Sequence, residues 1–196
     1  MIDTTVREAL EAAEAASGVR VHEYAQLPTS ALVFSHELLK SCATNVCGHY
    51  NKSWTCPPLA APLEEQQKKI LSYKNAFVFT TKHDLEDSFD YEGMELGAKL
   101  HTGLTLEFRN KLKEILTINA KDSFTVPVYG AGSCPICKDR DGKESCAFPS
   151  ACPFPEQRIS SIEAAGIYVT EMSKAAGIAY NNGPNTVTYF SMALLA

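Results

Sequence analysis

The sequence contains no concentrated run of lysine and arginine, and its overall charge is acidic. Its 18 basic residues are outnumbered by 23 acidic ones, which gives a formal net charge of -5 with histidine neutral. A protein that binds nucleic acid through the phosphates normally carries a basic face. This composition therefore argues against a nucleic-acid partner.

Long apolar runs are missing as well. No stretch approaches the roughly 18 apolar residues that a membrane span requires, and residues 1–7 lack the charged-then-apolar pattern of a signal peptide. We therefore expect no membrane partner and a cytoplasmic location. With 45% hydrophobic and 21% charged residues, the composition is that of a globular chain and excludes intrinsic disorder.

The chain also lacks internal repeats, low-complexity tracts and segments of linker composition. Its 196 residues fall in the usual range of one domain, so we expect a single cysteine-rich domain over residues 1–196. Helix and strand patterns alternate along it: helices are predicted at about 5–17, 62–73, 90–117, 161–166 and 170–176, and strands at about 19–24, 31–34, 76–80, 124–129 and 186–192. The expected fold class is α/β, a mixed sheet with flanking helices and two cysteine-rich metal-binding loops.

The longest predicted helix, 90–117, carries its apolar residues on one stripe. Such a stripe requires a partner surface, and the strands predicted at 76–80 and 186–192 are the best apolar candidates. His101 lies on the stripe, either as a hydrogen-bonded core histidine or facing a cofactor. The acidic segment 84–95 is either a solvated surface or a face for a basic partner.

Cysteine is the residue type that points to chemistry. Seven cysteines fall into two groups separated by a long cysteine-free stretch. An odd number cannot pair completely into disulfides, and disulfides are rare in a reducing cytosol. Because cysteines scattered through a core would not cluster in this way, we expect them to bind metal. The candidate metal ligands are Cys42, Cys47, Cys56, Cys134, Cys137, Cys146 and Cys152.

The later group contains four cysteines, of which Cys134 and Cys137 enclose only two residues. Two thiolates at this spacing can turn toward one centre, and four complete either a tetrahedral zinc site or a 4Fe-4S cluster. Structural zinc usually shows two close pairs, whereas here the gaps before Cys146 and Cys152 hold eight and five residues. The spacing favours one 4Fe-4S cluster at this group; zinc and unligated or redox-active thiols are the alternatives.

The earlier group, Cys42, Cys47 and Cys56, is one thiolate short of a closed site. A second cluster here would take a fourth ligand from His49 or from a cysteine elsewhere, or would keep an open position at which iron could bind a substrate. The alternative is that the three thiols complete a structural site or pack without metal.

Four motifs carry a resemblance to a known family. They are Cys42-x4-Cys47-x2-Tyr50, Cys56-Pro57-Pro58, Cys152-Pro153-Phe154-Pro155-Glu156 and the run from Ser161 to Val169. These motifs resemble a family of predicted metal-binding, cysteine-rich proteins of unknown function, found mainly in anaerobic prokaryotes. The resemblance covers most of the chain and implies metal binding without a defined activity. One departure is the segment between Cys137 and Cys146, which is longer than the family pattern leads us to expect.

Three hypotheses of function follow from the cysteines. The first is an iron–sulfur protein that exchanges electrons with a redox partner protein, because no acid/base or nucleotide-binding motif accompanies the thiols. The second is an iron–sulfur enzyme whose open iron site acts on a small or sulfur-containing substrate. The third is a zinc-stabilised interaction protein, in which both sites only tie loops to the domain. The sequence does not choose between them, and it leaves the oligomeric state open.

Overall fold

A mixed β-sheet organises the chain. The computed structural model describes residues 4–119, 126–138, 142 and 145–195. Within these residues, five strands form one sheet in the order β1-β2-β5-β3-β4, antiparallel throughout except for the parallel pair β3 and β4. The strands are β1 (Tyr24–Pro28), β2 (Asn75–Asp84), β3 (Val128–Gly130), β4 (Ser160–Ser161) and β5 (Thr186–Leu195). The predicted α/β class with a mixed sheet is confirmed.

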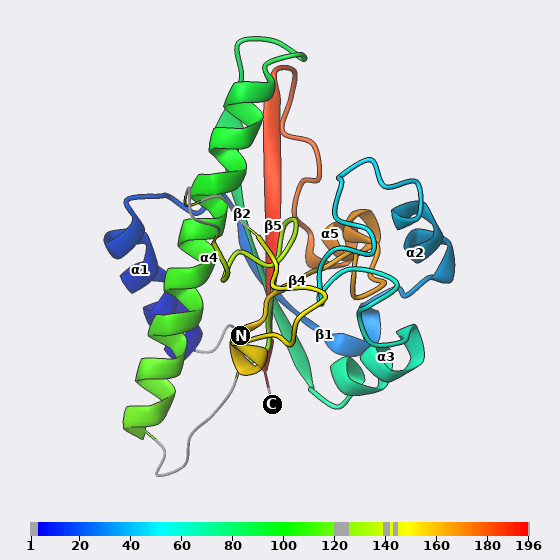
Figure 1. Ribbon diagram of the computed structural model, residues 1–196. Helices are drawn as coiled ribbons and strands as arrows, with labels where there is room; N and C mark the ends of the chain where they lie inside the picture. The colour runs from blue at the N-terminus through cyan, green and yellow to red at the C-terminus, as the bar shows by residue number, and fades with distance from the viewer. Residues whose placement is uncertain (1–3, 120–125, 139–141, 143–144, 196) are drawn as a thin grey trace.

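Helices lie on both sides of this sheet (Figure 1). On one side are α1 and α4, and on the other are α2, α3 and α5. The helices are α1 (Thr4–Ser17), α2 (His36–Cys42), α3 (Leu63–Leu71), α4 (Tyr91–Asn119) and α5 (Val169–Ala176), with 3-10 turns η1 (Thr29–Ala31) and η2 (Pro155–Gln157). No helix in the described part of the chain is long and apolar enough to cross a membrane.

The alternation of side chains along β2 creates a core on each side of the sheet. Phe77 and Phe79 point to one face, where their rings lie 5.8 and 5.0 Å from the ring of Phe108 in α4. Between them, Val78 packs into the opposite core. The stripe on the long helix therefore meets β2, and β2 pairs with β5 over its whole length. This arrangement confirms the predicted packing of the long helix.

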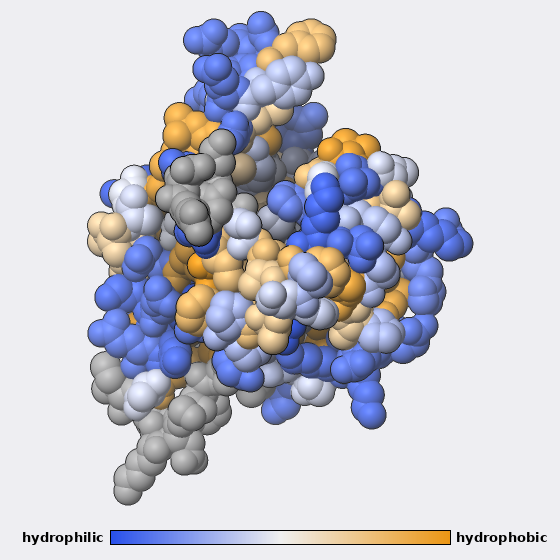
Figure 2. All heavy atoms as spheres, viewed as in Figure 1, coloured by the Kyte–Doolittle hydropathy of each residue, from blue (hydrophilic) through white to orange (hydrophobic). Residues whose placement is uncertain are grey.

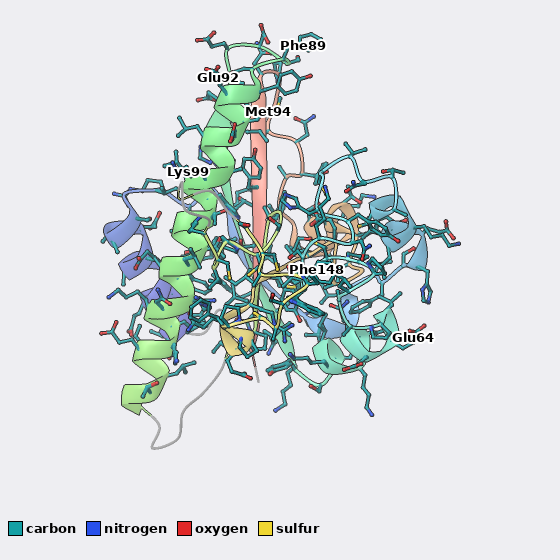
Figure 3. All side chains as sticks on the ribbon, viewed as in Figure 1. Glu64, Phe89, Glu92, Met94, Lys99 and Phe148 are labelled. Carbon is teal, nitrogen blue, oxygen red and sulfur yellow. The ribbon has the colours of Figure 1, made fainter. Side chains whose placement is uncertain are left out.

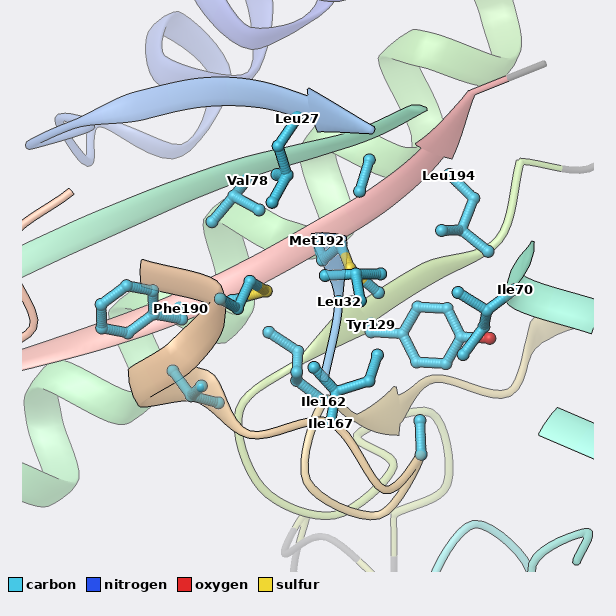
Figure 4. Packing of buried hydrophobic residues seen from close by; sticks show 14 of the residues in the cluster. Leu27, Leu32, Ile70, Val78, Tyr129, Ile162, Ile167, Phe190, Met192 and Leu194 are labelled. Atoms are coloured by element: carbon cyan, nitrogen blue, oxygen red, sulfur yellow. The ribbon is translucent and has the colours of Figure 1, made fainter. Parts of the chain in front are cut away.

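The second core lies between the sheet and the side that carries α3 and α5 (Figure 4). Ile70 of α3 and Met172 of α5 are fully buried there. The chain turns into this core at Gly166, whose φ is +81°, and a Cβ at this position would overlap the side chain of Leu63. The turn after β4 is thereby held directly against α3.

Two predicted strands near the N-terminus are wrong. Residues 19–23 lie outside the strand, which runs from Tyr24 to Pro28 beside β2. Residues 22 and 23 do lie beside β2, because the His22 amide donates to the Thr80 carbonyl oxygen and the Thr80 amide donates to that of Glu23. The amides of Val19 and Val21 donate instead to side chains of α1, so the ladder does not extend to them. Residues 31–34 contain the end of η1 and a single bridge from Phe34 to Ile167.

Two later predictions also differ from the structure. Residues 161–166 form a turn rather than a helix, because the Ser161 hydroxyl accepts a hydrogen bond from the Ala164 amide and Gly166 takes a positive φ. The strand predicted at 124–129 begins at Val128, and residues 124 and 125 lie outside the described residues. Pro127 suggested an edge strand, yet β3 lies between β5 and β4, since the proline precedes the strand and removes no donor from it.

Six of the seven cysteines lie in two long connections between elements, and Cys42 ends the helix before the first of them. One connection, 43–62, joins α2 to α3; the other, 131–159, joins the parallel strands β3 and β4. A parallel pair always needs a crossover, and here the cysteine-rich segment provides it, with the 3-10 turn η2 as the one helical element among its described residues. Apolar residues gather in the middle of the face over which this crossover runs, whereas the projecting upper end is mainly hydrophilic (Figure 2).

Candidate metal centre

The four cysteines of the later group line one small pocket. The other residues around it are Ser53, Trp54, Thr55, Ile136, Phe154 and Arg158. Burial raises the pKa of the Cys137 thiol, and the neighbouring thiols of Cys152, Cys134 and Cys146 raise it further. Four thiolates that repel one another in this way are stabilised when a cation is placed among them.

Hydrogen bonds converge on the sulfur of Cys146. Burial opposes ionisation of this thiol, but the amides of Phe148, Trp54 and Ala147 and the hydroxyl of Ser53 hydrogen-bond to it, and the net effect is a lowered pKa. Thiolate is the form in which cysteine binds metal. The unusual spacing before Cys146 therefore does not keep it from the pocket.

The three cysteines of the earlier group also lie close to one another. Burial raises the pKa of the Cys42 thiol, and the charges of Cys47 and Glu163 add to this rise. Burial likewise raises the pKa of Cys56, although hydroxyls of Ser53 and Thr55 hydrogen-bond to its sulfur and oppose the change. Cys42 ends α2, and Cys47 is exposed in the connection that follows.

Glu163 brings a carboxylate to this group, which the sequence analysis missed. Its side chain is exposed overall, yet crowding by the surrounding chain desolvates the carboxyl and raises its pKa, against hydrogen bonds from its own amide and the Ser161 hydroxyl. We interpreted the sequence around it as a helix cap, so no signal linked it to cysteines more than a hundred residues away. His49, the ligand that the sequence suggested, is half-buried in the same connection as Cys47 and stays a prediction.

A short buried segment brings the two cysteine groups together. The side chains of Ser53 and Thr55 are only 3% and 6% exposed. The Ser53 hydroxyl lies within hydrogen-bonding reach of the sulfur atoms of both Cys56 and Cys146. The two groups are therefore neighbours in space, on either side of this serine, although nearly eighty residues of sequence separate Cys56 from Cys134.

Further contacts fix this segment in place. The Trp54 indole N–H donates to the carbonyl oxygen of Ser150 at 3.0 Å, and its ring packs edge-on against Phe148 with centroids 5.2 Å apart. The Ser160 hydroxyl donates to the carbonyl oxygen of Thr55 at 3.0 Å. The first cysteine connection is thus attached both to the second and to β4 at the edge of the sheet.

The donor set suits a thiophilic metal centre. All seven cysteines are free thiols, and cysteine thiolates are the ligands of structural zinc and of iron–sulfur clusters. As their side chains are positioned, no three histidine, cysteine, aspartate or glutamate residues in the described part of the chain already form a group that could hold a metal ion. The fit therefore rests on the chemistry of the donors and on the pocket that four of them share.

A comparison with family models shows to which family the chain belongs. Residues 25–195 match the family model described as "Predicted metal-binding protein (DUF2284)". The chain belongs to this family. The match spans both cysteine groups and supports metal binding by this DUF2284 protein, while the description names neither the metal nor a reaction. Comparison with curated proteins and with solved structures gave no match.

His101 is not part of the cysteine site. It is fully buried, with Nδ1 2.9 Å from the Thr81 hydroxyl and Nε2 2.8 Å from the Ser191 hydroxyl. The interpretation of this residue as a hydrogen-bonded core histidine is confirmed. The acidic segment 84–95 is remote as well: Phe89 and Glu92 lie at the projecting end of α4, whereas Phe148 of the cysteine crossover lies in the middle of the molecule (Figure 3).

Proposed function

We propose that this protein binds a 4Fe-4S cluster through Cys134, Cys137, Cys146 and Cys152 and exchanges electrons with a partner protein. The observation that carries the proposal is that all four thiols of this group line one pocket. Zinc would use the same ligands, but the sequence shows one close pair of cysteines where structural zinc usually shows two.

The chain's own contribution is to hold the thiolates and to limit access of water. A bound 4Fe-4S cluster supplies one-electron chemistry, with a potential set by hydrogen bonds to the sulfurs and by solvent exposure. The amides and the hydroxyl that hydrogen-bond to Cys146 provide the hydrogen bonds to sulfur. The pocket is also lined by Trp54, Ile136 and Phe154, whose apolar side chains limit the exposure of the cluster to solvent.

The position of the pocket supports one direction of approach for the proposed redox partner. Phe154 is 44% exposed, so the pocket wall that it forms reaches the surface. The acidic end at 84–95 projects away from the crossover that carries the later cysteines (Figures 1 and 3). We therefore place the partner at the 131–159 crossover and not at the acidic end.

Metal and acid-labile sulfide analysis of protein purified without oxygen tests this proposal. We expect brown protein, and we expect Cys137→Ser and Cys152→Ser each to lose about four iron and four sulfide per chain, the content of one cluster. Cys47→Ser is the matched control, because the exposed Cys47 belongs to the earlier group, and it should keep this cluster. Colourless protein with stoichiometric zinc, or full iron and sulfide content in either variant, would contradict the proposal.

A second candidate function is an enzyme with an open iron position at the earlier group. The observation in its favour is that the charges of Cys42, Cys47 and Cys56 act on one another, and that the carboxylate of Glu163 acts on Cys42. Carboxylate is a weaker ligand for such iron than thiolate and leaves the position exchangeable. In a Cys137→Ser background, the remaining cluster spectrum should shift on addition of cyanide or a small thiol. Absence of any metal in that background would exclude this function.

A further inference from the structure

A second and larger cavity lies beside the cysteine pocket. Its volume is about 800 Å³, within the range of pockets that bind small molecules, roughly 300–1,000 Å³. Residues of α3, α4, β3 and the 155–160 segment line it. Trp54, Thr55 and Arg158 line both this cavity and the cysteine pocket, so the two share a wall.

Cationic side chains outnumber acidic ones around this cavity, although the chain as a whole is acidic. The cationic residues are Lys69, Arg109, Lys113 and Arg158, and the acidic ones are Glu65 and Glu156. Among the ion pairs within the described residues, none includes any of these four cations. The cavity therefore offers positive charge that the described part of the protein does not neutralise by direct pairing.

Backbone carbonyls hold the two arginines in place. Nη1 of Arg109 donates to the carbonyl oxygen of Gln157 at 2.7 Å, and Nε of Arg158 donates to that of Pro155 at 3.1 Å. Each bond uses one of the five N–H donors of a guanidinium. An oriented guanidinium is suited to binding a carboxylate or a phosphate.

Arg109 also connects the cavity with the later cysteines. Burial lowers the pKa of this guanidinium, and the nearby Cys134 thiolate opposes that shift. The side chain therefore lies close enough to Cys134 for their charges to interact, while it lines the larger cavity. An anion bound in the cavity would meet a cation whose charge already interacts with Cys134.

Aromatic and proline side chains form another part of the wall, beside polar ones such as Gln66 and Asn110. Trp54, Tyr73, Tyr129, Pro127 and Pro155 line the cavity. Burial raises the pKa of Tyr129 to about 12, so this residue adds no negative charge near neutral pH. Aromatic and proline surfaces of this kind favour a planar ring over a chain of polar groups.

We propose that this cavity binds a small aromatic anion. Its carboxylate or phosphate lies near Arg109 and Lys113, and its ring packs against the wall that contains Trp54. The proposal does not depend on which metal the cysteines bind. A ligand in this position would be separated from the cysteine pocket by the shared wall alone, which places it where a redox centre could act on it.

Calorimetric titration of protein purified without oxygen tests the proposal, with phenyl phosphate and benzoate as the anionic probes and phenol as the neutral one. We expect saturable binding of one anion or both at one site per chain, about tenfold or more tighter than phenol, because a charge-assisted hydrogen bond contributes roughly 1.5–3 kcal/mol. Preference for phenyl phosphate identifies a phosphate ligand, and preference for benzoate a carboxylate ligand. If neither anion binds more tightly than phenol, the proposal is wrong.

Two lysine variants locate the bound anion. Lys113→Gln should weaken binding about tenfold. Lys99→Gln is the matched control, because Lys99 is an exposed lysine of the same helix that does not line the cavity (Figure 3), and it should bind as the wild type does. Equal affinities of the two variants would overturn the assignment of the site. Metal content, measured in every sample, separates this outcome from a failure of metal binding.

Discussion

Ser53 lies between the two cysteine groups, beside Cys56 of the earlier group and Cys146 of the later one. Its hydroxyl is within hydrogen-bonding reach of Cys56 and Cys146 and lies 3.1 Å from the Thr55 hydroxyl. A serine in this position can respond to a change of charge at either sulfur, because a hydroxyl rotates freely between partners. Ser53 is therefore the side chain through which a change at one sulfur would reach the other.

Substitution of this serine should alter Cys146. In Ser53→Ala we expect the pKa of the Cys146 thiol to rise, because a donor that stabilises its thiolate is removed. The measurement is the pH dependence of alkylation of metal-free protein, quantified for the Cys146 peptide by mass spectrometry. The profile should move to higher pH. Ser72→Ala is the control, since the Ser72 hydroxyl donates to the Lys69 carbonyl oxygen and Ser72 does not line the cysteine pocket; a matching shift in both variants would contradict the role of Ser53.

Gly166 holds the turn after β4 against Leu63 of α3. This turn also carries Glu163. The Gly166 φ of +81° disfavours any other residue, and an added Cβ would overlap Leu63. We expect Gly166→Ala to lower the free energy of unfolding by about 2–4 kcal/mol, measured by urea denaturation. Gly177→Ala shares the positive φ but has open space around the added Cβ, so it should cost only about 1 kcal/mol. Equal losses would show that the contact with Leu63 is unimportant.

At the scale of elements, α4 is attached to the sheet by both apolar and polar contacts. Its Phe108 packs against two phenylalanines of β2, and its His101 bridges hydroxyls of β2 and β5. Thr105, one turn later, adds a hydrogen bond to Ser191 at 2.8 Å. Within the described residues, every buried side-chain nitrogen or oxygen has a hydrogen-bond partner, so this polar network does not weaken the core.

The same network makes stability depend on pH. Burial lowers the pKa of His101 from 6.5 to about 3, so below pH 6.5 the unfolded chain takes up a proton that the folded chain refuses. The stability that neutral His101 contributes is therefore fully present above pH 6.5 and is lost progressively as the pH falls from 6.5 toward 3. Between pH 7 and pH 5 the wild type should lose about 2 kcal/mol more than His101→Gln, measured by urea unfolding at both values. Equal losses would show that His101 is protonated in the folded protein.

At the scale of the whole molecule, the apolar cores and the cysteine connections are separate parts of the structure. The buried residues of the two cores come from the sheet, the helices, the 162–167 turn and the positions Leu32 and Ile178, and none of them is a cysteine. In the connection 43–62, the fully buried side chains are Ser53 and Thr55. The core should therefore fold without metal, while the connections depend on it.

Hydrogen exchange with and without metal tests this division. After removal of metal by an oxidant with a chelator, we expect faster amide exchange in the described parts of 43–62 and 131–159. Exchange in β2 and β5 should stay within about threefold of the metal-bound protein, because their ladder and the two cores are unchanged. If β2 and β5 lose protection to the same degree as the connections, the metal stabilises the whole fold instead.

The sequence by itself determined the long elements and the residue types of the candidate site. The helix at 90–117 was predicted because its apolar stripe extends over many residues, and the strands at 76–80 and 186–192 because they are runs of apolar, aromatic and β-branched residues. The short elements were missed: residues 31–34 and 161–166 depend on one bridge to Ile167 and on a glycine that fits against Leu63. Such contacts join residues far apart in the chain, and no local pattern records them.

The tertiary structure alone decided how the cysteines are arranged. Their grouping in the sequence indicated ligands, but it could not show that Ser53 lies between the groups, that Glu163 approaches Cys42, or that a cavity of about 800 Å³ shares a wall with the later thiols. The physical reason is that each of these contacts joins residues from segments that lie far apart in the sequence. Local sequence fixes which side chains can bind a metal or an anion, and the packing of distant segments fixes which of them meet.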